Sequence, residues 1–237
     1  MPLERLDKIL ASQNIGSRKE VGLLIRHGAV TVNGEIVKKA DCKADAETDA
    51  IAVHGEPICF KRFVYIMMNK PQGVLSAARD SRMKTVVDLL GPSLYRKGLF
   101  PAGRLDRDTE GLLILTDDGE FAHRMLAPKS HVFKLYHAVL DAPVTDEDIK
   151  RFRQGIVMGD MTCLPAELTV LKSGETPLVQ VKIREGKFHQ VKRMFRATGK
   201  NVLHLKRVQI GQLRLDPDLA PGEARELPVS EKNLIFK

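Results

Sequence analysis

One polar loop in the sequence gathers the side-chain types that acid–base or nucleophilic chemistry needs. It is the segment Gly103–Gly111, which reads GRLDRDTEG and runs directly into the apolar segment 111–116. A polar loop placed before a buried strand can hold a side chain in position at the end of a sheet. Asp106 is flanked by Arg104 and Arg107, and nearby cations favour an ionised carboxylate. An ionised Asp106 could act as a nucleophile or as a general base.

The same loop allows two other interpretations. It could be an Asp-rich turn whose surface ion pairs contribute little to stability. Asp106 and Asp108 could also bind magnesium, as in a metal-dependent phosphatase or nuclease whose activity a chelator would abolish. Asp117 and Asp118, followed by Gly119, are typical of a plain turn. Since no further acidic cluster has the spacing of metal ligands, we expect no metal site.

The distribution of charge favours a polyanionic partner. The chain of 237 residues has a formal net charge of +8, and the positive charge lies in residues 61–237 rather than in residues 1–60. It is most concentrated in Arg184–Arg207, where Glu185 is the one acidic residue among eight Lys and Arg. Clustered basic charge most often binds nucleic acid, although a solvated basic surface without a partner remains the alternative.

The composition excludes several classes of protein. The longest apolar stretch, Phe63–Met68, is far shorter than the ~20 residues that span a bilayer, and acidic residues near the N-terminus argue against a signal peptide. Cys42, Cys59 and Cys163 are odd in number and form no CxxC pair, which argues against a disulfide framework or a thiolate zinc site. We therefore expect a cytoplasmic protein of one or two domains without a membrane segment.

The first sixty residues are predicted to form a separate module of two helices and a hairpin. Apolar residues at helical spacing predict a short helix over 3–10. A Ser-x-x-Glu capping box at Ser17 begins a second helix over 18–27. Alternating β-formers around Asn-Gly predict a hairpin over 30–37, and a weaker pattern suggests another over 51–58. Two helices and a hairpin within forty residues make a compact unit.

Arg18 and Lys19 lie in the first turn of that second helix. The helix dipole disfavours cations there by roughly 0.3 kcal/mol or more. A phosphate at the helix N-terminus would be attracted by the dipole and by both side chains. The two residues are therefore either phosphate contacts or ordinary solvated cations.

Residues 61–237 are predicted to form a larger α+β domain. Its short strands, several of them linked as hairpins, favour a mixed, mainly antiparallel sheet flanked by helices. The expected strands are 63–68, 111–116, 134–140 and 178–184. The expected helices are 86–90, 120–126, one that begins at 145–148, and 189–198.

Four segments of this domain, in order, resemble the motifs of RNA pseudouridine synthases. Asn69–Gly73 resembles the opening strand and turn of that family, and Gly103–Leu113 resembles its catalytic motif. Phe133–Tyr136 resembles its Lys-x-Tyr segment, and Glu185–Met194 resembles its C-terminal motif. The agreement of four ordered motifs identifies the domain as a member of the family.

The N-terminal module resembles the RNA-binding domain first described in the fourth small-subunit ribosomal protein. The matching segments are Arg5–Leu10, Gly16–Lys19 and Arg26–Gly34. Together the two resemblances cover essentially the whole chain, with the boundary expected between residues 60 and 61. They imply that the second helix and the following loop of the module face RNA.

The resemblance implies an enzyme that isomerises uridine in RNA to pseudouridine, moving the glycosidic bond from N1 to C5 of uracil without a metal or other cofactor. Asp106 would be the catalytic aspartate, acting by nucleophilic attack or by proton abstraction at the ribose. Tyr136 would stack on the flipped uracil. Lys192 would keep Asp106 ionised, and Arg193 would replace it if the register differs. The two side chains point about 100° apart on a helix, so that only one can reach Asp106.

The remaining expected contacts are with RNA. Arg104 would position the backbone of the RNA or the catalytic loop itself, and His189 would be an RNA contact or a structural residue rather than an acid–base group. The expected RNA-binding residues are Arg18, Lys19, Arg26, Lys134 and His189.

The residues Phe188 and His189 before Gln190 resemble the family members that modify small-subunit rRNA. We therefore expect a target uridine in 16S rRNA, free or in a small-subunit assembly intermediate, and a monomeric enzyme. A target in 23S rRNA is the alternative within the same class. A ribosome-assembly factor that binds RNA without catalysis is the alternative from another class, but a pure binder would not need Asp106, Tyr136 and Lys192 together.

Overall fold

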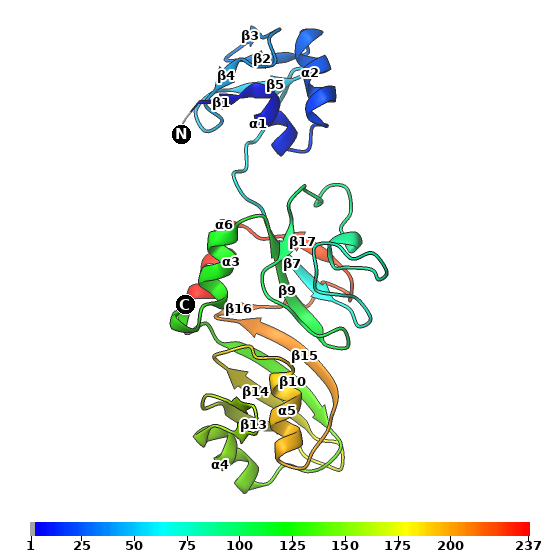
Figure 1. Cartoon of the computed structure of the whole chain (residues 1–237), viewed down its shortest axis with the longest axis vertical. Coiled ribbons are helices and arrows are strands. Elements are labelled where there is room, and N and C mark those ends of the chain that lie inside the picture. The colour runs from blue at the N-terminus through cyan, green and yellow to red at the C-terminus, as the bar shows by residue number, and fades with distance from the viewer. Residues whose placement is uncertain (1–2) are drawn as a thin grey trace. The chain divides into compact units, whose positions relative to one another are not determined.

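The computed structural model describes residues 3–237, which divide into two compact units (Figure 1). The first unit runs to Phe63 and includes the short segment Arg96–Gly98, and the second comprises Val64–Tyr95 and Leu99–Lys237. The boundary expected after residue 60 lies close to this division.

The first unit is built on two short helices and a four-stranded sheet of order β3-β2-β5-β6. A capping box begins α2, because Ser17 accepts from the backbone N–H of Glu20 and the Glu20 carboxylate accepts from that of Ser17. Both expected hairpins form, β2–β3 and β5–β6. The elements are β1 (Glu4–Arg5), α1 (Leu6–Ser12), α2 (Arg18–Arg26), β2 (Val30–Val32), β3 (Glu35–Ile36), β4 (Lys43–Ala44), β5 (Ile51–Val53) and β6 (Glu56–Pro57).

The core of this unit is its own. Buried residues of both helices pack against the inner positions of the strands, among them Leu6, Leu10, Ile25 and Val30. The unit therefore has the hydrophobic cluster that an independently folding module needs.

The second unit contains a nine-stranded sheet whose main order is β13-β14-β10-β15-β9-β7-β17. All its pairings are antiparallel except that of β15 with β9. The expected α+β class with a mixed, mainly antiparallel sheet is confirmed. The strands of this sheet are β7 (Tyr65–Lys70), β8 (Phe100–Pro101), β9 (Glu110–Thr116), β10 (Lys134–Leu140), β13 (Glu167–Lys172), β14 (Leu178–Ile183), β15 (Val202–Ile210), β16 (Leu213–Arg214) and β17 (Ala224–Glu226). The strands β11 (Val157–Met158) and β12 (Met161–Thr162) form a separate two-stranded sheet. Its helical segments are η1 (Val87–Leu89), α3 (Gly119–Leu126), η2 (Pro128–Ser130), α4 (Asp146–Gln154), α5 (Gln190–Ala197), α6 (Val229–Lys232) and η3 (Asn233–Phe236).

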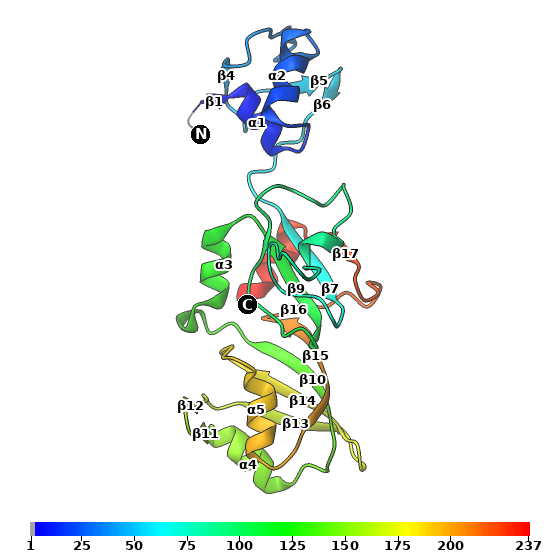
Figure 2. The same ribbon diagram turned by 45° about the vertical axis from the view of Figure 1, so that its right-hand side comes forward.

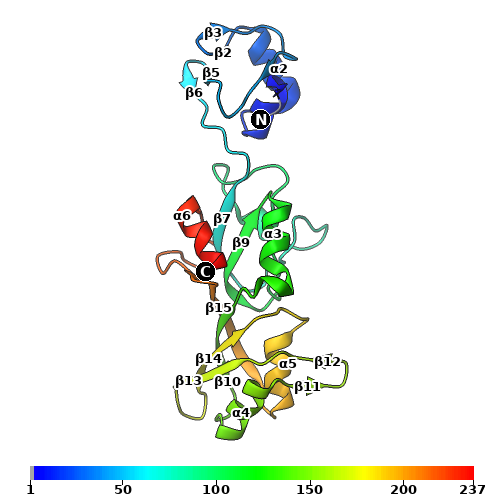
Figure 3. The same ribbon diagram turned by 90° about the vertical axis from the view of Figure 1, so that its left-hand side faces the viewer.

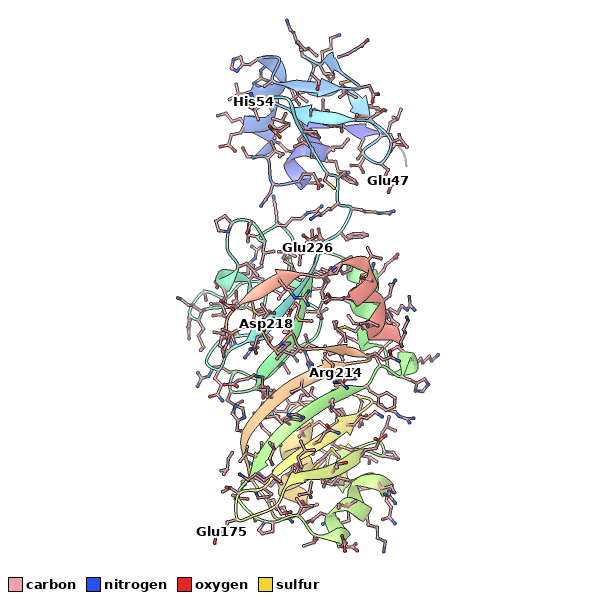
Figure 4. All side chains as sticks on the ribbon, turned by 180° about the vertical axis from the view of Figure 1, so that it is seen from behind. Glu47, His54, Glu175, Arg214, Asp218 and Glu226 are labelled. Carbon is pink, nitrogen blue, oxygen red and sulfur yellow. The ribbon has the colours of Figure 1, made fainter. Side chains whose placement is uncertain are left out.

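The helices α4 and α5 cover one face of the strands β13, β14, β10 and β15 (Figures 2 and 3). Phe152 of α4 and Phe195 of α5 pack against each other and against the inner side chains of these strands. The opposite face of the four strands, seen from behind in Figure 4, carries no helix among the described residues. The helix-covered face is the one on which the candidate site lies.

The second unit differs from the sequence prediction in one helix and in several strands that were not expected, among them β13 and β15. The helix expected at 86–90 is wrong, because the structure forms only the 3-10 turn η1 there. Thr85 and Asp88 cap that turn, and Leu90 already has an extended backbone, so the helix cannot continue. The long strand β15 was not expected, although it lies in the centre of the sheet.

Gly111 makes the parallel contact between β9 and β15 possible. It has a φ of +100°, and a Cβ at this position would lie 2.2 Å from the carbonyl oxygen of Arg207. The residue that ends the candidate catalytic loop therefore also lets its strand approach β15 closely.

Among the described residues, no helix is both long enough and apolar enough to cross a membrane.

Candidate active site

The loop that carries Asp106 lies between β8 and β9, and the Lys70 side chain binds its backbone. The Lys70 side chain is fully buried at the end of β7. Its Nζ donates to the backbone carbonyls of Pro71 (3.0 Å), Asp106 (3.1 Å) and Thr109 (3.0 Å). Burial lowers the pKa of Lys70 to about 8, although the carboxylates of the loop oppose that shift. One ammonium group thus joins several carbonyls of the loop and holds its backbone in place.

The Asp106 carboxylate contacts a cation on α5. Lys192 Nζ lies 3.0 Å from one carboxylate oxygen of Asp106 and 2.5 Å from Asp108 Oδ1. The Nε2 of His189 lies 3.6 Å from the other oxygen of Asp106. Burial alone would lower the pKa of Lys192, but its hydrogen bonds to the two aspartates raise it above the ordinary value. Lys192 is therefore a charged partner that orients Asp106 from the opposite side of the site.

Of the two neighbouring cations on α5, only Lys192 reaches Asp106. Arg193 pairs with Asp160, in the turn between β11 and β12. The register proposed from the sequence, with Lys192 and not Arg193 beside Asp106, is the one that the structure has.

Tyr136 lies on β10, with its side chain on the helix-covered face. The strand alternates between inner and outer positions, and Tyr136 is one of the buried inner residues. It shares a cavity of about 720 Å³ with Asp106 and Arg104. The size of this cavity is within the range of pockets that hold small ligands. A carboxylate and an aromatic side chain thus face one concave space.

Phe188 and His189 lie at the same cavity. Their rings stack with centroids 3.8 Å apart, and Phe188 is 71% exposed. His189 has a left-handed backbone, with a φ of +50°, directly before α5. An exposed aromatic ring beside a cavity is a surface on which a nucleotide base can stack.

The expected RNA-binding residues have different environments. Lys19 and Arg26 are exposed on α2. Arg18 pairs with Asp7 at 2.9 Å, which ties α2 to α1. Arg104 is exposed beside the cavity, whereas Lys134 is buried in the wall of the cavity and not on an outer surface.

Lys70 and Arg207 were missed as site residues. Arg207 is buried on β15, directly opposite Tyr136 in the antiparallel pair, and lines the same cavity. The signal for Lys70 was present, since a lysine ends an otherwise apolar strand before Pro71. The sequence contains little indication of Arg207, because it lies among many other cations in the basic segment Arg184–Arg207.

The described residues contain no cluster of three or more His, Cys, Asp or Glu that could hold a metal ion.

Comparison with known proteins agrees with this arrangement. The family model for "RNA pseudouridylate synthase" matches residues 64–197, which is more than half of the chain. The chain belongs to the RNA pseudouridine synthase family. The model for the S4 domain matches residues 4–47, in the first unit. The synthase thus combines a catalytic domain of that family with an N-terminal S4 domain.

Similar proteins match over nearly the full length of the synthase. It is 49% identical to an "Uncharacterized RNA pseudouridine synthase" of Bacillus subtilis, over 98% of each chain. It is 42% identical to "Ribosomal small subunit pseudouridine synthase A" of Escherichia coli, over 96% of this chain and 97% of that one. A solved crystal structure of a pseudouridylate synthase aligns with a TM-score of 0.68 and 37% identity, covering 98% and 99% of the two chains.

Proposed function

We propose that the synthase isomerises one uridine of 16S rRNA to pseudouridine and that Asp106 is its catalytic carboxylate. The observation that carries this proposal is the Asp106 carboxylate, held by Lys192 at 3.0 Å, at a cavity that also contains Tyr136. The small-subunit target is supported by the similarity to the Escherichia coli enzyme and by the Phe188–His189 pair at the cavity.

The cavity requires the target nucleotide to leave its helix. Extruding a base costs a few kcal/mol, which is least for a base that is already unpaired. Once inside, the uracil ring stacks on Tyr136 and the ribose C1′ approaches Asp106. Lys192 keeps the carboxylate oriented, and Lys70 keeps the loop from shifting while the base moves.

The same glycosidic bond of the uridine breaks in either role of Asp106. If the carboxylate attacks C1′, it forms a C1′–O bond as the C1′–N1 bond breaks. If it removes a proton from the ribose, the same C1′–N1 bond breaks. In both cases N1 keeps the electron pair and uracil turns. C5 then bonds to C1′, either as the C1′–O bond to Asp106 breaks or as Asp106 returns the proton to the ribose. The C5 proton is lost and N1 gains a proton, so that the overall reaction is an isomerisation.

The S4 domain supplies RNA contacts of its own. Lys19 and Arg26 are exposed on α2, where they are free to meet phosphates. Arg18 is held by Asp7, so its role is to fix the helix as well as to present charge. The substrate is the free rRNA or a small-subunit assembly intermediate, and the synthase acts in the cytoplasm as a monomer.

The test maps pseudouridine in transcripts of 16S and 23S rRNA after incubation with the synthase. Carbodiimide labelling followed by primer extension gives a stop at each pseudouridine. We expect one new stop in 16S rRNA. A stop only in 23S rRNA would keep the reaction and overturn the target. If no stop forms in either transcript or in assembly intermediates, the synthase is a non-catalytic RNA-binding protein.

The Asp106→Asn variant is the control for the catalytic residue. We expect it to produce no stop and to bind the transcript with nearly unchanged affinity, because affinity depends mainly on phosphate contacts. Affinity is measured by filter binding at a fixed salt concentration. Loss of binding together with activity would argue against a catalytic role for Asp106.

A further inference from the structure

Two buried cations lie together in the wall of the active-site cavity. Lys134 is 6% exposed and Arg207 is 5% exposed, and both line the cavity with Tyr136. Arg207 donates from Nε to the carbonyl of Leu112 at 2.8 Å and from Nη1 to the Tyr136 hydroxyl at 3.5 Å. Its Nη2 is buried and has no hydrogen-bond partner among the described residues. The charge that acts on the Lys134 ammonium is the like charge of Arg207, with no acidic residue among those described to balance it.

These two charges are unfavourable for the empty enzyme. Burial lowers the pKa of Lys134 to about 8, and the positive charge of Arg207 lowers it further. Burying a charge without a counter-ion is costly, and placing a second like charge beside it adds to the cost. The other charged residues that line the cavity are Arg104, Asp106, Arg107, Lys187 and His189.

A ligand that brings negative charge into the cavity would remove this cost. Asp106 does not supply it, because its carboxylate contacts Lys192 and His189. A phosphodiester is a poor candidate, because it stays with the ribose and the two side chains are almost completely buried. The uracil ring is the part of the substrate that enters most deeply, beside Tyr136.

We propose that Lys134 and Arg207 stabilise the uracil anion that forms when the C1′–N1 bond breaks. This inference rests on the proposed reaction but holds for either role of Asp106. When the bond breaks, N1 keeps the electron pair and the negative charge spreads over N1, O2 and O4 of the ring. The two cations donate hydrogen bonds to this anion and keep their own protons. The anion then bonds to C1′ through C5, either as the C1′–O bond to Asp106 breaks or as Asp106 returns the proton to the ribose. The C5 proton is lost to water, and N1 takes a proton from water.

The positions of Lys134 and Arg207 suit the stabilisation of an anion in the cavity. Donors fixed in advance, in a site that excludes water, stabilise a developing charge without having to reorganise. Arg207 is fixed by Leu112, and its pairing with Tyr136 across the two strands places it beside the base. Removing one donor of this kind typically lowers the rate by about 10²–10³-fold.

The experiment compares Lys134→Met with Lys134→Arg and with the control Lys182→Met. Lys182 lies on the neighbouring strand β14 at an outer position, beside Glu167. The rate is measured in a single turnover with the enzyme in excess over 16S transcript. We expect Lys134→Met to lose about 10²-fold in rate with unchanged affinity, Lys134→Arg to regain most of it, and Lys182→Met to match the wild type.

A change of leaving group separates this role from a structural one. RNA that contains 5-fluorouridine releases a more stable anion, which needs the two cations less. Glycosidic cleavage is followed by digestion and chromatography as loss of the N1-linked nucleoside. We expect the rate loss of Lys134→Met to shrink at least tenfold on this RNA. Equal losses on both RNAs would overturn the proposal.

The other outcomes are also decisive. Weaker RNA binding with an unchanged single-turnover rate would mean that the pair binds phosphate, and the proposal would be wrong. A lower unfolding temperature in both Lys134 variants would make the residue structural, and would also overturn it. If the wild type forms no pseudouridine, it is the proposed function that fails.

Discussion

At the scale of single residues, the site depends on which of two adjacent cations reaches the carboxylate. Lys192 contacts both Asp106 and Asp108, and Arg193 is occupied by Asp160. The helix geometry that separates neighbouring side chains by about 100° thus gives two similar residues different tasks. The difference can be measured by changing each residue in turn.

Lys192→Met should lower the single-turnover rate by about 10²-fold, because Asp106 loses the cation that orients it. Arg193→Met should lower it less than about threefold, because it removes an ion pair that does not contact Asp106 and whose Asp160 side chain is exposed. Both rates are measured on the same transcript, with RNA affinity as the control for overall integrity. If Arg193→Met were the more damaging change, the assignment of Lys192 would be wrong.

Lys134 makes the stability of the synthase depend on pH. The pKa of Lys134 is about 8 in the folded chain, against 10.5 for the unperturbed group. Between these values the unfolded chain holds a proton that the folded chain has released, so this group's contribution to the free energy of unfolding rises with pH. Below about pH 8 its unfavourable contribution is fully present.

The free energy of unfolding of Lys134→Met at pH 7 should therefore be higher than that of the wild type by roughly 1–3 kcal/mol. The advantage should shrink as the pH rises from about 8 toward 10.5. Urea unfolding at pH 7 and pH 9.5 measures both quantities, and Lys134→Arg, which keeps its charge, should show no such advantage. A variant that is less stable than the wild type at pH 7 would contradict the sign.

At the scale of elements, the end of one strand fixes the loop that precedes another. Lys70 ends β7, and its ammonium reaches the carbonyls of Asp106 and Thr109, just before β9. β7 and β9 pair along six positions, from Tyr65 with Thr116 to Lys70 with Gly111. The register of this pair therefore determines the position of the loop that carries Asp106.

Lys70→Met should lower the rate at least tenfold, because the loop carbonyls lose their shared donor and Asp106 loses its fixed position. It should also lower the free energy of unfolding by about 1–3 kcal/mol. Lys84→Met, which removes an exposed cation from the same unit, is the control. Rates and urea unfolding are compared at pH 7, and an unchanged rate would show that the loop is held without Lys70.

Short-range sequence patterns predicted much of this architecture. They could not predict the contacts between residues that lie far apart in the sequence. The capping box at Ser17, the Asn-Gly hairpin and the inward residues of α5 depend on neighbours within a few positions, and all are present. Arg207 becomes a site residue only because β15 pairs with β10 and β9, both of which lie far from it in sequence. Without knowledge of this strand pairing, nothing distinguishes Arg207 from the other cations of the basic segment Arg184–Arg207.

At the scale of the whole molecule, the synthase has two units that each have a core, one with an S4 domain and one with the synthase family match. The hydrophobic cluster of the first unit includes Leu6, Leu10 and Ile25. The hydrophobic clusters of the second unit contain no residue of the first unit. Most of the excess positive charge lies in residues 61–237, so we expect the second unit to attract RNA by itself. We expect the S4 domain to add RNA contacts that select the target.

Deleting residues 1–60 should therefore leave a folded protein with little remaining preference for the target rRNA. Circular dichroism should show a cooperative transition in the truncated chain, because the remaining residues have enough core to fold. Its rate with saturating RNA should stay within about tenfold of the full chain, while a higher RNA concentration is needed to reach it. An unfolded truncated chain would show that the two units depend on each other.

The salt dependence of RNA binding identifies which cations of the S4 domain meet phosphate. Removing a cation that neutralises one phosphate reduces the slope of log K against log salt concentration by about 0.7–0.9. Changing Lys19 and Arg26 together to Ala should therefore make the slope of the full-length synthase shallower by roughly 1.4–1.8. The same measurement on Arg18→Ala should be accompanied by reduced stability in urea, because Arg18 ties α2 to Asp7 of α1. An unchanged slope in the double variant would place the RNA on another face of the domain.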